Sequence, residues 1–335
     1  MVKRLILIHG RSIKPAEIPM RQLARDAIAE GLGRAGKPAV AQGLADGSIA
    51  FELVYYGDIN NRIQADADTK DAAALQALDP SHGNAACLDI AGMRQDFDRV
   101  RTIGALTKAR YQKVLETADD ARFADEAADF LSLVNAIFAF GLLGDFALKN
   151  ATPDFAQYLL DQETGSLVRE RLNAKLLPAM LAGDDICLVA HSMGSVVAYD
   201  QMWKYSHLSE YAHVRGAATR IKLWVTIGCP LGEFAVRQRL YDRGMAEKDK
   251  NPREIVDEWR NFYAEDDFIS HVEELRPVFG GMTKKGLKLL KDLHVYNCWS
   301  YRDNNSGRLV ANPHDLYGYL MNQAVGQRIG EWAES

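Results

Sequence analysis

The length, composition and charge of the chain exclude several classes of protein. Its 335 residues are 47% hydrophobic and 25% charged, a balance that supplies a buried core and argues against disorder. The net charge of −5, with no clustered basic segment, argues against nucleic-acid binding. The longest apolar stretch, residues 130–143, is shorter than the ~20 residues of a membrane span. No span is therefore expected, while contact with a lipid interface stays open.

The N-terminal residues and the cysteines indicate a compartment. The apolar run at residues 5–8 is too short for the core of a signal peptide, and no small-residue cleavage site follows it. The cysteines are widely separated, and three lie in or beside apolar stretches, which is typical of reduced core cysteines. They are Cys87, Cys187, Cys229 and Cys298. We expect a cytoplasmic protein, and because no metal-ligand spacing such as His-Glu-x-x-His occurs, we expect neither a metal nor a cofactor.

The first part of the chain alternates between strand and helix. Residues 5–8 form a continuous apolar run that fits a buried parallel strand, and residues 15–30 keep the apolar stripe of a helix. Residues 49–59 favour extended backbone. The glycine-rich segment 31–37 has the spacing of nucleotide-binding loops, but a helix precedes it where a strand is required. It is therefore predicted to be a helix-ending turn.

Residues 60–150 differ in composition from the rest of the chain. They are rich in Ala, Asp, Arg and Gln and have few β-branched residues, which is typical of helices. A charged segment, residues 97–129, precedes the apolar segment 130–143. We predict a helical cap insertion at residues 60–150, carried by a core that consists of residues 1–59 and 151–335.

The second half of the chain returns to alternating strands and helices. Strands are predicted at residues 186–190, 221–228 and 293–299, and helices at residues 161–182, from residue 196 onward and at residues 314–332. Strands that alternate with helices indicate parallel strands with helices on both faces of the sheet. The predicted fold class is therefore α/β.

A serine stands at the sharpest of the predicted strand-to-helix turns. The apolar strand ends at His191, Ser192 follows, and the helical pattern then begins. A serine at such a turn is held out of the sheet with its hydroxyl exposed, and the N–H of Met193 faces whatever the serine attacks. This is the placement of a nucleophile.

A serine nucleophile needs two partners. An alcohol is weakly nucleophilic near neutral pH, so a base must lie within hydrogen-bond reach of it, and a carboxylate must orient that base. In an open α/β sheet, reactive groups collect in loops beyond the carboxyl ends of the strands. The acidic loop at residues 265–267 and the loop around His314 both have this placement.

The sequence Ala-His-Ser-Met-Gly at residues 190–194, between a strand and a helix, resembles the nucleophile elbow of the α/β-hydrolase superfamily. The usual motif is Gly-x-Ser-x-Gly, from which this chain departs by one methyl group, at Ala190. The resemblance covers the core on both sides of the insertion, from His9-Gly10 through residues 226–231 to the closing helix. It implies an α/β-hydrolase fold with a mostly parallel sheet, and the chain order serine, acid, histidine.

The resemblance also implies roles for individual residues. Asp267 matches the aspartate that precedes an apolar pair in the acid loop of the family, with Asp266 as the alternative. His314 lies where the histidine of the family is expected, just before the closing helix, while His271 and His294 remain open as alternatives.

An oxyanion hole is implied as well. The Met193 N–H would be one donor, and the loop at His9-Gly10-Arg11 resembles the His-Gly loop of the family, which makes the Arg11 N–H the second donor. For Gly10, an ordinary strand-ending turn is an equally good interpretation.

The function implied by the resemblance is that of a serine esterase, or a lipase-like hydrolase, acting on a small acyl ester through an acyl-enzyme intermediate. The apolar segment 130–143 would either line an acyl pocket or pack in the core. Two alternatives remain: a binding protein of hydrolase fold without turnover, and a thioesterase or acyltransferase that uses the same three residues.

Overall fold

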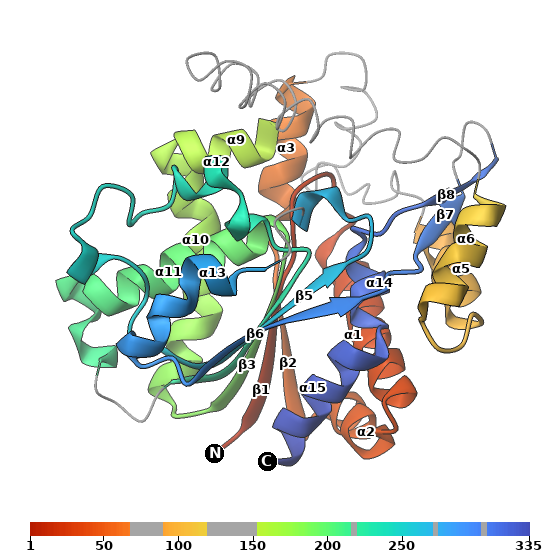
Figure 1. Cartoon of the computed structure of the whole chain (residues 1–335), viewed down its shortest axis with the longest axis horizontal. Helices are drawn as coiled ribbons and strands as arrows, with labels where there is room; N and C mark the ends of the chain where they lie inside the picture. Colours follow the sequence, from red (N-terminus) through yellow and green to blue (C-terminus); the bar gives the residue numbers. More distant parts are fainter. Residues whose placement is uncertain (68–89, 119–152, 216–219, 271–273, 303–306) are drawn as a thin grey trace.

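The computed structural model describes residues 1–67, 90–118, 153–215, 220–270, 274–302 and 307–335. Among these residues, six parallel strands form one sheet in the order β2-β1-β3-β4-β5-β6 (Figure 1). The strands are β1 (Lys3–Ile8), β2 (Ile49–Val54), β3 (Asp185–His191), β4 (Ile221–Ile227), β5 (Val256–Ala264) and β6 (Leu289–Val295). A small antiparallel pair is formed by β7 (Ser300–Arg302) and β8 (Leu309–Ala311).

Helices cover both faces of the sheet (Figure 1). The helices α1 (Glu17–Arg34), α2 (Pro38–Asp46), α5 (Ile90–Arg101), α6 (Lys108–Thr117), α14 (Leu316–Leu320) and α15 (Gln323–Glu334) lie toward one face. The helices α3 (Gly57–Ala67), α9 (Pro153–Leu160), α10 (Gln162–Leu181), α11 (Met193–His207), α12 (Phe234–Arg237) and α13 (Arg276–Phe279) lie toward the other face. Short 3-10 helices span Ser209–Val214, Pro230–Gly232, Glu247–Asp249, Phe268–Ser270 and Gly280–Lys285.

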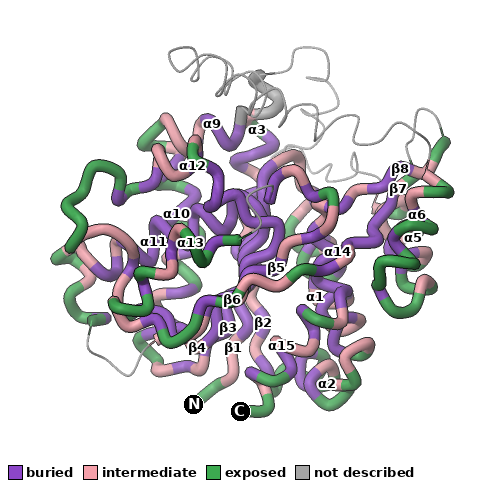
Figure 2. Tube along the Cα trace, in the orientation of Figure 1, coloured by how far each residue is buried: buried purple, intermediate pink, exposed green. Residues whose placement is uncertain are grey.

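The alternation of side chains along each strand divides the core in two. Leu7 and Val189 pack into one hydrophobic cluster, and the adjacent residues Ile8 and Leu188 pack into the other. A strand that is buried on both faces reads as a continuous apolar run, which is why the central strands were recognisable from sequence. Figure 2 shows this buried layer running through the molecule.

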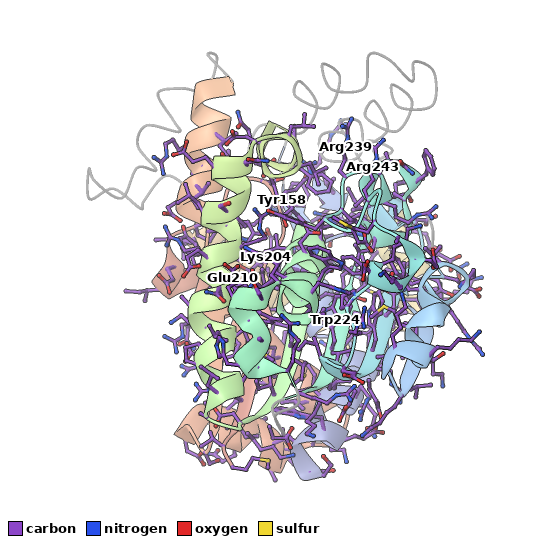
Figure 3. All side chains as sticks on the ribbon, turned by 90° about the vertical axis from the view of Figure 1, so that its left-hand side faces the viewer. Tyr158, Lys204, Glu210, Trp224, Arg239 and Arg243 are labelled. Carbon is purple, nitrogen blue, oxygen red and sulfur yellow. The ribbon has the colours of Figure 1, made fainter. Side chains whose placement is uncertain are left out.

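The layer of α9, α10 and α11 faces the viewer in Figure 3. Lys204 and Glu210 form a 4.0 Å ion pair on its outside. Behind this layer, Trp224 of β4 is fully buried and stacks on Trp259 of β5, with the ring centroids 4.1 Å apart. The indole pair fills the space between the sheet and the helices, a large apolar contribution to the core.

The α/β prediction is confirmed, but several element boundaries differ from expectation. The strand predicted at residues 49–59 ends at Val54, because residues 57–67 form α3 with Asp58 in its first turn, where a carboxylate interacts favourably with the helix dipole. The helix expected from residue 196 begins at Met193, directly after Ser192.

Two further differences follow from asparagine side chains. The strand predicted at residues 293–299 ends at Val295, since the Asn297 side chain accepts a hydrogen bond from the Trp299 N–H and turns the chain. The closing helix predicted at residues 314–332 is divided into α14 and α15. Asn322 caps α15 by accepting a hydrogen bond from the Ala324 N–H.

The predicted glycine turn and the cysteines have the expected structure. Helix α1 ends at Arg34, within the glycine-rich segment 31–37, and α2 begins at Pro38. Cys187, Cys229 and Cys298 are free and buried. Cys87 lies outside the described residues.

The described parts of the predicted insertion are helical. They comprise most of α3 together with α5 and α6, and α5 packs on α1 and on β7 while α6 packs on β8. Phe97 and Tyr111 of these helices belong to the hydrophobic cluster on the α1 side of the sheet. The apolar segment 130–143 lies outside the described residues, so its role stays a prediction. In the described part of the chain, no helix has both the length and the apolarity to cross a membrane.

Candidate functional site

Ser192 occupies a strained turn at the carboxyl end of β3. Its φ is 53° and its ψ −127°, a conformation that residues other than glycine rarely adopt. Close packing requires glycine two residues later, because a Cβ at Gly194 would lie 2.5 Å from the carbonyl oxygen of His9. Ala190 pairs with Ile8 and Thr226 in the sheet, so the strand keeps its partners on both sides up to the turn. The turn therefore has the sharp geometry predicted for it.

Ser192, His314 and Asp267 are joined by hydrogen bonds. The His314 Nε2 lies 2.9 Å from the Ser192 Oγ, and the His314 Nδ1 lies 3.0 Å from both carboxylate oxygens of Asp267. Because an ionised carboxylate only accepts hydrogen bonds, the Nδ1 carries the proton and the Nε2 is free to accept the serine proton. The Asp267 side chain is 0% exposed and that of His314 is 12% exposed, so the pair is shielded from water.

Loops at the same end of the sheet supply the histidine and the aspartate. Asp267 follows β5 and accepts hydrogen bonds from the Ile269 N–H at 3.0 Å and the Tyr319 hydroxyl at 2.5 Å. His314 lies between β8 and α14, and its N–H donates to the Asn312 side chain at 3.0 Å. Each loop is thus held by several hydrogen bonds.

The alternative acid and bases have other partners. Asp266, at φ 60°, accepts a hydrogen bond from the Tyr111 hydroxyl at 3.1 Å. The His294 Nε2 pairs with Glu265 at 2.9 Å. His271 lies outside the described residues. Of the described candidates, Asp267 and His314 are the ones that reach Ser192.

A second buried histidine contacts His314. The His191 Nε2 donates a hydrogen bond to the backbone carbonyl of His314 at 2.8 Å, and the two ring centroids are 4.8 Å apart. Burial lowers the pKa of His191 well below its ordinary value, and the nearby His314 adds to this effect. A neutral His191 ring therefore holds the segment that carries His314.

The loop after β1 lies against the serine. A Cβ at Gly10 would lie 2.7 Å from the Ser192 Cβ, so only glycine fits there without displacing its neighbours. The Ser12 N–H donates to Asp154 at 2.5 Å, which fixes the far side of the loop. Arg11 lies between these two anchored residues.

His9 also anchors this loop. Its Nδ1 donates to the Gly10 carbonyl at 2.8 Å, and its Nε2 accepts a hydrogen bond from the Tyr56 N–H at 3.1 Å. The ring stacks on Tyr56 with the centroids 4.0 Å apart. Burial, and next the charge of Lys14, lower the pKa of His9 to about 3. The neutral tautomer is therefore fixed.

The other predicted oxyanion donor, Met193, is the first residue of α11. The N–H groups in the first turn of a helix have no acceptor within the helix, so they are available to a ligand. Met193 and the Gly10 loop thus flank Ser192. For metals, no group of three or more potential ligands among His, Cys, Asp and Glu occurs in the described ranges.

Several contacts at this site could not be found by sequence reasoning. Tyr319 of α14 donates to Asp267, and His191 of β3 donates to the carbonyl of His314. No motif marks Tyr319, and His191 stands at a variable position of the elbow motif. Gly228 lies beside both His314 and Asp267, and the sequence predicted it only as the last residue of a strand.

The arrangement can move a proton from the Ser192 hydroxyl to His314 while the buried Asp267 carboxylate stabilises the imidazolium that forms. Such a site can form a covalent bond between the serine oxygen and an electrophilic carbon. Comparison of the chain with protein-family models, with curated proteins and with solved structures found no match.

Proposed function

We propose that this protein is a serine hydrolase of the α/β-hydrolase type that cleaves carboxylic esters through an acyl-enzyme intermediate. The observation that carries the proposal is the hydrogen-bonded series Ser192 Oγ, His314 Nε2, His314 Nδ1 and Asp267, with separations of 2.9 and 3.0 Å. These are the distances expected between a nucleophile, its base and the group that orients the base.

The position of the serine in the sheet supports the fold assignment. Ser192 follows β3, which lies inside the sheet between β1 and β4, and it precedes α11 directly. A strained strand-to-helix turn that raises a serine at the carboxyl end of a parallel strand is the nucleophile elbow of that fold. The chain order serine, aspartate, histidine also agrees with it.

The reaction we propose has two halves. Ser192 attacks the ester carbonyl while its proton passes to the His314 Nε2, and the tetrahedral intermediate collapses as His314 returns that proton to the departing alcohol. Water then attacks the acyl-serine and gives a proton to His314. Collapse of the second intermediate releases the carboxylic acid and restores the Ser192 hydroxyl.

Each intermediate carries a negative charge on the former carbonyl oxygen. We propose that the N–H groups of Met193 and Arg11 donate hydrogen bonds to this oxyanion. Supporting this, Met193 begins a helix and the Gly10 loop contacts Ser192. Removing one such donor typically costs ~100- to 1,000-fold in kcat.

The experiment is to treat the protein with a fluorophosphonate probe and with p-nitrophenyl esters of short and long acyl chains. Wild-type protein should be labelled and should release p-nitrophenol. Ser192→Ala should lose both, with turnover falling by about 10⁴-fold or more. Ser195→Ala is the matched control. It removes a buried hydroxyl from the first turn of α11, which directly follows Ser192, and that hydroxyl donates to the Ala190 carbonyl at 3.1 Å and not to His314.

The outcomes separate the alternatives. Labelling and turnover that persist in Ser192→Ala, in protein whose circular dichroism is unchanged, would contradict the proposal. A wild-type protein that folds but is never labelled would favour a binding protein without turnover. Acyl transfer to added alcohols or thiols in preference to water would indicate a transferase, and faster cleavage of thioesters than of oxygen esters would indicate a thioesterase.

A further inference from the structure

We propose that Tyr319 is a positioning residue of this site: its hydroxyl fixes the Asp267 carboxylate in the orientation that holds His314 toward Ser192. The inference deepens the proposed hydrolase function and rests on it. Tyr319 would not touch the substrate, because it is fully buried and acts through Asp267.

The Tyr319 hydroxyl is fixed in direction by two hydrogen bonds. Its oxygen accepts from the backbone N–H of Ala264 at 2.9 Å, and its proton is donated to the Asp267 Oδ2 at 2.5 Å. Ala264 is the last residue of β5, so the hydroxyl is tied to the sheet itself. Burial, and next the charge of Asp267, raise the pKa of Tyr319 well above its ordinary value. The hydroxyl therefore stays protonated and serves Asp267 only as a donor.

The Asp267 carboxylate depends on its few donors. Its side chain is 0% exposed, and a buried carboxylate is costly unless hydrogen bonds compensate for the lost water. The Oδ1 accepts from the Ile269 N–H at 3.0 Å and from the Ser270 N–H at 3.4 Å, the Oδ2 accepts from Tyr319, and the His314 Nδ1–H lies 3.0 Å from both oxygens. The Oδ1 thus has backbone donors of its own, while Tyr319 is the donor that the Oδ2 does not share with the Oδ1.

The helix that carries Tyr319 also follows the base directly. Asp315, the residue after His314, caps α14 by accepting from the Tyr317 N–H at 2.7 Å and the Gly318 N–H at 3.2 Å. The helix is packed tightly, since a Cβ at Gly318 would lie 1.8 Å from the Asn297 Oδ1. The base and the donor to the acid are thus held on one short, rigid segment.

The same helix provides a matched control. Tyr317 is buried like Tyr319, but its hydroxyl has no hydrogen-bond partner among the described residues. Tyr317→Phe and Tyr319→Phe therefore each remove one buried oxygen from α14, and only the second removes a hydrogen bond to the acid.

The test measures kcat and KM for a p-nitrophenyl ester, and the rate of fluorophosphonate labelling, across pH in both variants. Tyr319→Phe should lower kcat about tenfold with little change in KM, because an incorrectly held base affects the chemical step. The acid limb of its pH profile should move to higher pH. Without the Tyr319 hydroxyl, one hydrogen bond to the Asp267 carboxylate is lost, and its negative charge is less compensated. That charge then stabilises the His314 imidazolium more strongly, so His314 loses its proton at a higher pH. Tyr317→Phe should match wild type in kcat, in KM, in the labelling rate and in the pH profile.

A second readout does not require turnover. In protein with 13C-labelled histidine, and in a Ser192→Ala background, the NMR titration of His314 should have a higher midpoint after Tyr319→Phe and an unchanged midpoint after Tyr317→Phe. His314→Gln assigns the resonance. Melting temperatures of both variants report the stability cost.

Each result has a defined meaning. If Tyr319→Phe lowers only the melting temperature, with pH profile and titration unchanged, Tyr319 is merely structural and the inference is overturned. The inference is also overturned if both variants behave alike. If wild-type protein is never labelled but Tyr319→Phe shifts the His314 titration, the hydrolase proposal fails while the positioning contact stands.

Discussion

Gly228 lies so close to His314 that a Cβ on it would be 2.9 Å from the ring atoms Cε1 and Nδ1. The same atom would be 3.0 Å from the Asp267 Oδ2. Gly228 directly follows β4 and has a φ of 54°, a left-handed conformation that favours glycine. The end of β4 therefore forms one wall of the site, and the absence of a side chain leaves room for the His314–Asp267 pair.

Gly228→Ala should accordingly reduce activity far more than stability. The added methyl group would push His314 off its line to Ser192, and a misplacement of about 1 Å can cost ~100-fold in rate. Left-handed backbone costs alanine about 1 to 2 kcal/mol. We expect kcat/KM for a p-nitrophenyl ester to fall ~100-fold or more, with a moderate drop in melting temperature.

Gly47→Ala is the control for the backbone cost. Gly47 caps α2 with a φ of 83°, and a Cβ there would meet no atom within 4 Å. Gly47→Ala should lower the stability about as much as Gly228→Ala does, while its kcat/KM stays at the wild-type value. Equal losses of activity in the two variants would show that Gly228 matters only through its backbone conformation.

Gly10→Ala should block the serine itself. The added carbon would be 2.7 Å from the Ser192 Cβ and 3.3 Å from its Oγ, so either the loop after β1 or Ser192 must move. We expect fluorophosphonate labelling to slow ~100-fold or more. Gly33→Ala, at an open position in α1, should keep full labelling and gain about 0.5 to 1 kcal/mol of stability from helix propensity. Labelling of Gly10→Ala at the wild-type rate would disprove the close approach of Gly10 to Ser192.

Sequence reasoning predicted the sheet and the three residues of the candidate site for a physical reason. Buried parallel strands leave continuous apolar runs, and the segment around Ser192 couples such a run to a sharp turn and a helix within a few residues. Asp267 and His314 were assigned by their place after later strands and by resemblance, and the structure brings both to Ser192.

The supporting contacts depend on information that is not local. Tyr319 lies in α14, the first of the two helices into which the predicted closing helix is divided, and that division was not predicted. His191 directly precedes Ser192 in the chain, yet its ring reaches the carbonyl of His314. Both contacts join residues 52 or more positions apart, so no spacing rule could reveal them.

His9 should make the protein sensitive to acid. Its pKa in the folded state, about 3, lies below the ordinary value of 6.5, so between these values the unfolded chain binds the extra proton. The stabilisation is complete above pH 6.5 and is lost as the pH falls toward 3. His9→Gln removes this titration. Between pH 7.5 and 4.5, wild-type protein should therefore lose about 2 to 3 kcal/mol more than the variant.

Chemical denaturation at the two pH values measures this difference. His213→Gln, which replaces an exposed histidine, is the control. Its free energy of unfolding should change between the two pH values as much as that of wild type does. His191, whose pKa burial also lowers, should leave a remaining acid sensitivity of the same sign in His9→Gln. Parallel pH dependence in wild type and His9→Gln would show that His9 is not held neutral.

The two adjacent aspartates can be separated by paired amide substitutions. Asp267→Asn would place an amide against the His314 Nδ1, favouring the tautomer whose Nε2 carries a proton and cannot accept one from Ser192. We expect kcat to fall by about 10⁴-fold. Asp266→Asn keeps an oxygen for the Tyr111 hydroxyl, and asparagine tolerates the φ of 60° at that position, so activity should stay within a few-fold of wild type. Fluorophosphonate labelling rates and ester turnover measure both variants. A larger loss in Asp266→Asn than in Asp267→Asn would reassign the acid and, with it, the hydrogen bond through which Tyr319 acts.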